Sequence, residues 1–227
     1  MKKTKSQLGL IGFLLAIVVA GFGVVVPGEP AWARSPKVKD ESALKVGVYN
    51  YAHIGGLELR EAEGQAGRLF LRAGVRIAWV GCAREESEVL SYPECSSRDV
   101  VLRILPASMS DAFNSHAEAL GAAISTAKPE RAWVASVFYD RVASRASSWK
   151  LDPGLVLGDT AAHELGHLLL GPGHSRHGIM QAIWTPEDLR RASRGEMPFT
   201  PDEPASLKNA VTVLSVKAAP LLASGSK

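Results

Sequence analysis

Residues 163–167 have the sequence His-Glu-Leu-Gly-His, and this short run constrains the chain more than any other feature. On an α-helix, residues four apart lie on one face, about one turn apart. The imidazoles of His163 and His167 can therefore reach a single metal ion. Glu164 follows the first histidine directly, so its carboxylate can act as a general base toward a water molecule at that metal. The pattern predicts a catalytic zinc site on a helix.

A third ligand is also available in the sequence. Catalytic zinc sites take three protein ligands and leave one position open. His174 follows the helical run after the glycine at position 171, which can end the helix. The chain has six histidines, and four of them lie within the fifteen residues 163–177. We therefore expect one zinc ion held by His163, His167 and His174.

The flanking residues indicate that the metal-binding run lies on a helix. Asp152 and Pro153 supply an N-cap and a proline at the first helical position. Gly171 is a suitable residue just past the C-terminal end. Apolar residues recur between these limits with helical spacing, namely Leu155, Ala161, Ala162, Leu165, Leu168 and Leu169.

The longer stretch HELGHLLLGPGH, followed by HGIM, resembles the metzincin clan of zinc metallopeptidases. The resemblance implies that His163, His167 and His174 are the zinc ligands and that Glu164 is the base. It also implies that Met180 belongs to the Met-turn, a methionine-containing turn that forms a floor beneath the metal. The fold implied is a metzincin-like α/β (α+β) domain. Its mixed, mostly parallel sheet has an antiparallel edge strand, and it carries a backing helix, an active-site helix and a C-terminal helix.

The spacing departs from the usual metzincin motif by one extra residue, giving HExxHxxxGxxH. This longer spacing resembles the archaemetzincin branch, but the cysteines that this branch carries after its third histidine are missing here. Met180 also follows His174 after only six positions. The third ligand is therefore open to an alternative, because His177 lies three residues past His174 and could take its place.

A glutamate is a second alternative for the third ligand. Glu187 follows His167 by twenty residues, a spacing that resembles the glutamate-ligand metallopeptidases, or gluzincins. Residues 185–188 also have the pattern of a capped first helical turn, where acidic residues are expected for dipole reasons. This second interpretation argues against a role for Glu187 at the metal.

The first 33 residues predict a signal peptide. Three lysines precede an apolar or glycine-containing run over residues 8–26, and residues 31–33 read Ala-Trp-Ala, which fits the small-x-small cleavage rule. An uncleaved membrane anchor is the alternative, because the apolar run approaches spanning length. We expect a secreted or periplasmic protein with a mature N-terminus at Arg34 and no stable membrane association.

Charge and cysteine content limit the possible partners and predict a disulfide. The leader carries three of the 26 basic residues and one of the 23 acidic ones, so the remainder is nearly neutral and does not predict a nucleic-acid partner. Cys82 and Cys95 are the only cysteines, and in an exported protein such a pair predicts a disulfide. Residues 34–218 are expected to form one monomeric domain, followed by a flexible tail over 219–227.

Apolar runs predict strands at residues 46–51, 75–80, 100–105 and 132–138, and a helix at 57–73. The strand–helix–strand order implies a parallel crossover. Residues 119–125 are a short strand candidate, to which the metzincin resemblance assigns the edge that pairs with an extended substrate. Residues 139–141 are expected to form a loop or a short helix, and a capping box at 200–203 predicts a C-terminal helix toward residue 214.

Together these patterns predict an exported zinc-dependent endopeptidase with a peptide or protein substrate. Two other classes fit the same residues. One is a non-catalytic zinc- or peptide-binding pseudo-enzyme, although a structural zinc site needs no base such as Glu164. The other is a zinc hydrolase that acts on an amide or ester outside proteins.

Overall fold

The computed structural model describes residues 43–82, 95, 98–113, 118–124 and 133–218. The expected leader and the expected C-terminal tail lie outside these residues. The described residues belong to one compact unit, Lys39–Lys227. Among them, no helix combines the length and the apolar character needed to cross a bilayer.

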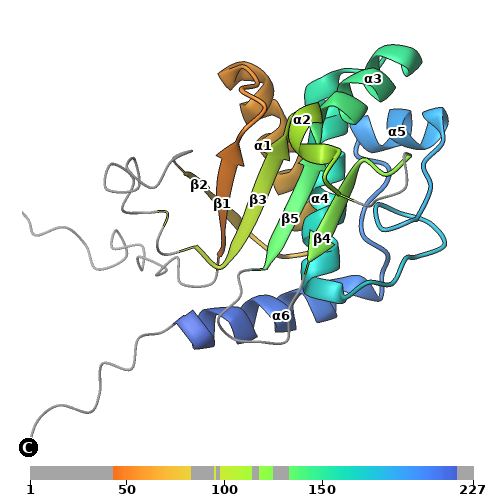
Figure 1. Ribbon diagram of the computed structural model, residues 1–227. Helices are drawn as coiled ribbons and strands as arrows, with labels where there is room; N and C mark the ends of the chain where they lie inside the picture. Colours follow the sequence, from red (N-terminus) through yellow and green to blue (C-terminus); the bar gives the residue numbers. More distant parts are fainter. Residues whose placement is uncertain (1–42, 83–94, 96–97, 114–117, 125–132, 219–227) are drawn as a thin grey trace, which may run out of the picture. The chain divides into compact units, whose positions relative to one another are not determined.

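Five strands form a single sheet (Figure 1). They are β1 (Leu44–Asn50), β2 (Ile77–Gly81), β3 (Val100–Leu105), β4 (Gly121–Ile124) and β5 (Val134–Phe138). The strand order is β2-β1-β3-β5-β4. Every neighbouring pair is parallel except β4 and β5, which are antiparallel. This arrangement confirms the expected mixed, mostly parallel sheet with an antiparallel edge strand.

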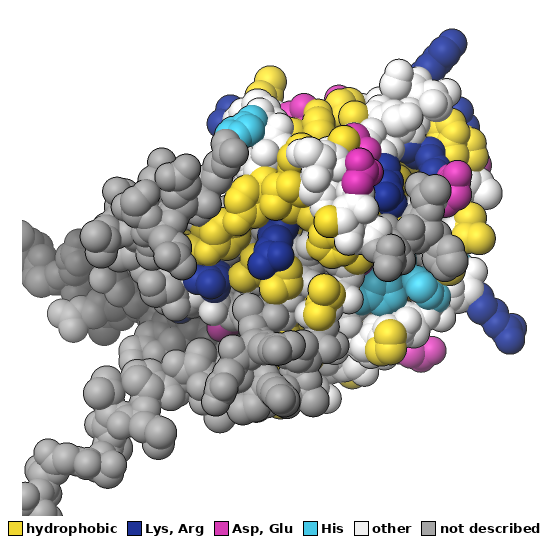
Figure 2. All heavy atoms as spheres, viewed as in Figure 1, with side chains coloured by type: hydrophobic (Ala, Val, Ile, Leu, Met, Phe, Trp, Pro, Cys, Tyr) yellow, Lys and Arg dark blue, Asp and Glu magenta, His cyan; other side chains and the backbone are white. Residues whose placement is uncertain are grey.

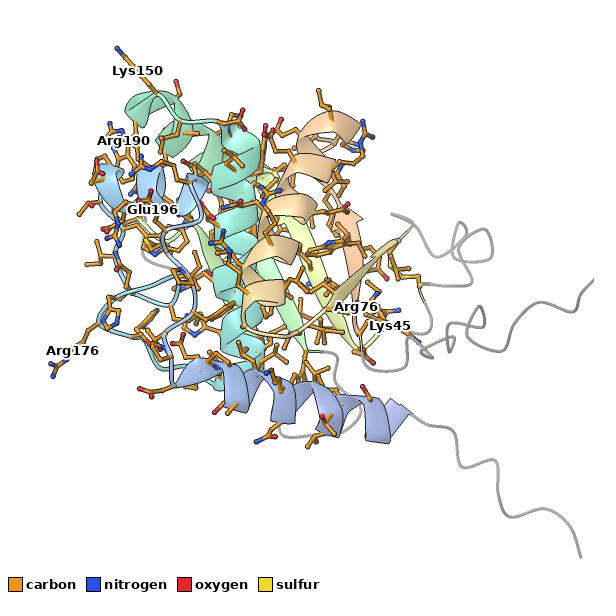
Figure 3. All side chains as sticks on the ribbon, turned by 180° about the vertical axis from the view of Figure 1, so that it is seen from behind. Lys45, Arg76, Lys150, Arg176, Arg190 and Glu196 are labelled. Atoms are coloured by element: carbon orange, nitrogen blue, oxygen red, sulfur yellow. A yellow bond between two sulfur atoms is a disulfide. The ribbon has the colours of Figure 1, made fainter. Side chains whose placement is uncertain are left out.

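Six helices accompany the sheet in the described part of the chain. They are α1 (Gly56–Arg72), α2 (Ala107–Ser110), α3 (Tyr139–Trp149), α4 (Pro153–Leu170), α5 (Pro186–Ser193) and α6 (Glu203–Ala218). Helices α1 and α4 lie side by side on one face of the sheet, and α6 crosses one end of both (Figures 1 and 3). Helix α1 lies where the sequence predicts a helix, and the buried residues on its inward face include Ala62, Ala66, Leu69 and Phe70.

The segment after β5 is a helix, the second of the two expected alternatives. This helix, α3, extends beyond residues 139–141 and has about three turns over residues 139–149. Val142 and Ala146 lie one turn apart and are both buried, so this helix has a narrow apolar face. Two apolar residues are too few to predict a helix of this length from the sequence. The helix ends at Lys150, which has a left-handed backbone conformation.

The predicted second strand also differs in its surroundings. It begins two residues later than expected, at Ile77, and all its residues are partly or fully exposed. Within the described residues, this strand lies at an edge of the sheet and pairs with one strand, β1. The apolar residues of this segment correctly predict a strand, but the strand is not buried.

Helix caps agree closely with the sequence. The carboxylate of Asp152 accepts hydrogen bonds from the backbone N–H groups of Gly154 and Leu155, at 2.8 and 3.3 Å. This N-cap fixes the start of α4 and therefore the direction in which its histidines point. At α5, Thr185 and Asp188 form the expected capping box.

Cys82 and Cys95 form a disulfide, as predicted. The bond joins the residue after β2 to a buried residue 13 positions later, with the two Cα atoms 5.5 Å apart. The hydroxyl of Tyr49 on β1 lies 3.5 Å from the sulfur of Cys95, which places the bond beside the sheet.

Candidate metal centre

Helix α4 carries the three residues that the sequence singled out first. His163 and Glu164 are buried, and His167 is half-buried. The same helix buries Leu165, Leu168 and other apolar residues in the core, so packing holds it firmly. The functional side chains therefore project from a rigid element rather than from a loop.

Three imidazoles meet at one point. The Nε2 atoms of His167 and His163 are 3.0 Å apart, and those of His167 and His174 are 3.2 Å apart. Two nitrogens bound to a tetrahedral zinc ion at its usual bond length would lie about 3.3 Å apart. His163, His167 and His174 are thus spaced as three ligands of one such ion, and they are the only group of this kind among the described residues.

The tautomers of two of these histidines are fixed by the backbone. Nδ1 of His163 lies 2.8 Å from the carbonyl oxygen of Ile179, and Nδ1 of His167 lies 3.0 Å from that of Gly171. A carbonyl oxygen can only accept, so both Nδ1 atoms carry the proton in the neutral ring. Both Nε2 atoms then present lone pairs to each other at 3.0 Å. That arrangement is repulsive without a cation and favourable around one.

Burial favours the neutral form of two of the imidazoles. Desolvation is the main cause that lowers the pKa of His163 to about 4; the bond to Ile179 opposes it, and the neighbouring histidines contribute in the same direction as desolvation. Desolvation and the nearby His167 also lower the pKa of His174. A histidine binds a metal only in its unprotonated form, so these residues are ready to bind at neutral pH.

The turn after α4 brings His174 back toward the helix. The backbone N–H of Ser175 donates to the carbonyl of Met180 at 2.9 Å, which closes a tight loop. The N–H of Ile179 donates to Pro198 at 3.1 Å and anchors the same loop on the other side. The short spacing between His174 and Met180 is therefore spanned by one hydrogen-bonded turn.

Met180 lies beneath the histidine-bearing helix. Its side chain is buried, with 1% exposure. A Cβ atom added at Gly166 would collide with the sulfur of Met180, so the glycine between Glu164 and His167 allows this close packing. The structure therefore packs Met180 closely against the helix that carries His163 and His167.

The two alternative third ligands lie outside the cluster. His177 is exposed and does not join the group of three. The Glu187 carboxylate is also exposed, and it lies 3.5 Å from Arg190 and 3.7 Å from Arg194. Arg176, a candidate for stabilising an oxyanion, extends outward from the protein (Figure 3). His53 is exposed in the segment after β1, and His116 lies outside the described residues.

Glu164 occupies an apolar setting between α4 and the edge strand β4. Burial raises the pKa of its carboxyl to about 8. A divalent cation at the nearby imidazoles would oppose this effect, since positive charge favours the carboxylate form. A buried carboxyl on the residue after the first of three converging imidazoles therefore fits a site for a cation.

Two further residues at the site escaped prediction. The Trp184 ring packs edge-to-face on His163, with centroids 5.3 Å apart, and its indole N–H is buried without an acceptor among the described residues. Gly121, the first residue of β4, lies against Glu164. A tryptophan four residues past the methionine and a glycine in a small-residue strand were visible in the sequence, but nothing marked them as neighbours of the site.

Histidine side chains reach the surface of one face, where a few hydrophobic side chains lie near them (Figure 2). His174 is exposed, whereas His163 is almost fully buried. The cluster can therefore offer three nitrogen donors to an ion, and one of the three side chains lies at the protein surface. Three histidines are a donor set that zinc sites use.

Similarity to known proteins is found among solved structures. No profile of a known protein family matches the chain, and no curated protein matches it in sequence. A crystal structure of archaemetzincin from Methanopyrus kandleri is similar, with 16% identity and a TM-score of 0.48. The alignment covers 77% of this chain and 99% of that one.

Proposed function

We propose that this protein is an exported, zinc-dependent endopeptidase. The convergence of three histidine Nε2 atoms, on two rings oriented by backbone carbonyls and a third from the loop, carries this proposal. A buried carboxyl on the residue after the first histidine adds a base at the same place. A structural zinc site needs neither a base nor an open side.

The histidines would hold the ion and tune it. When bound, zinc supplies a Lewis acid that polarises the scissile carbonyl and makes a nearby water more acidic. The bonds from His163 to Ile179 and from His167 to Gly171 keep the rings oriented and increase the basicity of their Nε2 atoms. His174 completes the set from the loop.

Glu164 would move the proton. Its carboxylate accepts a proton from the attacking water and delivers it to the leaving amine, which is the general acid–base part of peptide hydrolysis. The carboxyl side chain forms no bond with the three histidines, so it is free for this task. Removing its basicity should stop turnover without removing the ion.

The edge of β4 is a suitable place for an extended substrate. Phe138 donates its N–H to the carbonyl of Leu120 at 2.8 Å, and Gly121 lies opposite Val137. Bonded pairs alternate along an antiparallel ladder, so the backbone groups of Gly121 and Ala123 point away from β5. Within the described residues, no further strand occupies that edge. A peptide could add there as a strand.

The experiment compares the exported wild-type protein with a Glu164→Gln variant. Both are incubated with casein, quenched-fluorescent peptide libraries and cell-envelope fragments, with and without a chelator. We expect peptide cleavage by the wild type, loss of cleavage with chelator, and a loss of several orders of magnitude in Glu164→Gln with its zinc retained. Cleavage restricted to non-protein amides or esters would replace the endopeptidase proposal. Zinc binding without any hydrolysis would favour a pseudo-enzyme.

Export is a part of the proposal that has its own test. N-terminal sequencing or intact mass of the protein recovered outside the cytoplasm should give Arg34 as the first residue. Recovery of a full-length, membrane-bound product would show instead that the apolar run acts as an anchor.

A further inference from the structure

The first residue of β4 leaves no room for a side chain. A Cβ atom built on Gly121 would lie 2.7 Å from Cγ of Glu164, 2.7 Å from its Oε1, and 2.7 Å from the backbone oxygen of Ser136 on β5. Carbon atoms do not approach this closely without displacing their neighbours. The Glu164 carboxyl therefore occupies the space that any other residue at position 121 would fill.

The two faces of Gly121 serve different neighbours. Its missing side chain faces α4 and Glu164, whereas its backbone N–H and carbonyl face the open edge of the sheet. The carboxyl of Glu164 thus lies against the backbone of the edge strand, and this side chain is only 6% exposed. Helix α4 confines it on one side and β4 on the other.

We propose that Gly121 is a positioning residue for Glu164, setting the place of the carboxyl through the absence of a side chain. This inference rests on the proposed function, because it assigns Glu164 the role of base. A general base must lie within hydrogen-bond reach of the proton that it takes. A displacement of about 1 Å can lower a rate by about 10²-fold. A methyl group at position 121 would displace the carboxyl of Glu164 or move β4 away from β5.

The main test is the variant Gly121→Ala, with Gly81→Ala as the matched control. Gly81 is also a strand glycine at a sheet edge, but a Cβ atom there would meet nothing within 4 Å. Zinc content, kcat and KM are measured for both variants on a peptide that the wild type cleaves. For Gly121→Ala we expect retained zinc, KM within about threefold of wild type and kcat lower by about 10²-fold. Gly81→Ala should match the wild type.

A second measurement separates the contact with Glu164 from the contact with Ser136 and needs no activity. The Gly121→Ala change is made in the wild type and in a Glu164→Ala background, and thermal unfolding midpoints are compared with metal removed. We expect the change to lower the midpoint clearly less in the Glu164→Ala background, because only the clash with Ser136 remains there.

Several results would overturn the positioning role. One is loss of zinc in Gly121→Ala, and another is a fall in kcat no larger than that of Gly81→Ala. The others are equal midpoint shifts in the wild-type and Glu164→Ala backgrounds, or failure of Gly121→Ala to fold in both of these backgrounds. If the wild type binds zinc but cleaves nothing, the endopeptidase proposal fails, while the unfolding comparison still decides whether Gly121 makes room for Glu164.

Discussion

The carbonyl oxygen of Ile179 accepts a hydrogen bond from Nδ1 of His163, at 2.8 Å. The residue before Met180 therefore orients the most buried imidazole of the cluster. The turn that carries the methionine thus does more than lie beneath the helix, because its backbone also fixes which nitrogen of His163 faces the metal position. Turn and helix act together as one support for the ligands.

The ligand set is the first prediction to test. His174→Ala should lose the metal under conditions where the wild type keeps it, because two imidazoles remain where three converge. Elemental analysis of zinc after exhaustive dialysis gives the result directly. The matched changes His177→Ala and Glu187→Ala should keep the zinc, since both side chains lie outside the cluster. Retention of zinc by His174→Ala together with its loss from Glu187→Ala would establish a glutamate-ligand site instead.

The packing of Met180 on Gly166 gives a second prediction. Met180→Ala should lower the free energy of unfolding by about 2–5 kcal/mol, because it empties a buried site. Gly166→Ala should also destabilise the wild type, since the new Cβ would meet the sulfur of Met180. In the Met180→Ala background the glycine change should cost clearly less. Urea unfolding of the four proteins provides this comparison, and additive losses would show that the two residues do not interact.

Asp159 gives a third prediction, which concerns pH. This residue is fully buried on α4, and Gln65 donates to its Oδ1 at 2.7 Å, while its Oδ2 has no partner among the described residues. Burial raises the pKa of Asp159 to about 7, against an ordinary value of 3.8, and the bond from Gln65 and the charge of Arg68 oppose the rise.

Between these two pH values the folded chain holds a proton that the unfolded chain has released. The stability that this proton contributes is present below about pH 4 and is lost as the pH rises through about 7. The Asp159→Asn variant has no proton to release at this position. Its free energy of unfolding relative to that of the wild type should therefore increase between about pH 4 and pH 7, by at most about 4 kcal/mol. Urea unfolding of metal-free protein from pH 4 to 8 measures the difference. Asp202→Asn, at an exposed position, should show no such trend.

The disulfide provides a fourth prediction. The bond closes a loop with a sequence separation of 13 residues, and a loop of this size is expected to stabilise the fold by about 3 kcal/mol. Reduction, or the double change Cys82→Ser and Cys95→Ser, should lower the free energy of unfolding by that amount. The exported protein should have a mass two hydrogens below that of the dithiol form. Two thiols that react with alkylating agent in native protein would contradict the bond.

Local patterns in the sequence were sufficient to predict much of the site. Three features depend on residues close in sequence. They are the N-cap of α4 at Asp152, the helical periodicity that buries one face of α1, and the capping box at Thr185. Such short-range rules describe hydrogen bonds and helical periodicity directly. The spacing of His163 and His167 belongs to the same class, because one helical turn determines it.

Contacts between distant segments were beyond the same rules. Neither the proximity of Gly121 to Glu164 nor the packing of Trp184 on His163 follows from spacing. Both depend on how β4 and the loop after Met180 are folded onto α4. The order of the strands, with β3 and β5 inserted between β1 and β4, is likewise a tertiary property. A sequence pattern can indicate a strand without indicating its neighbours.

The backbone bonds to the two helix histidines have a consequence for the strength of metal binding. Ile179 and Gly171 orient these rings as part of the fold, so the entropy cost of ordering them is met during folding rather than on binding. An ion at this position would order fewer groups as it binds than one held by three unrestrained side chains, which favours affinity at the same number of ligands.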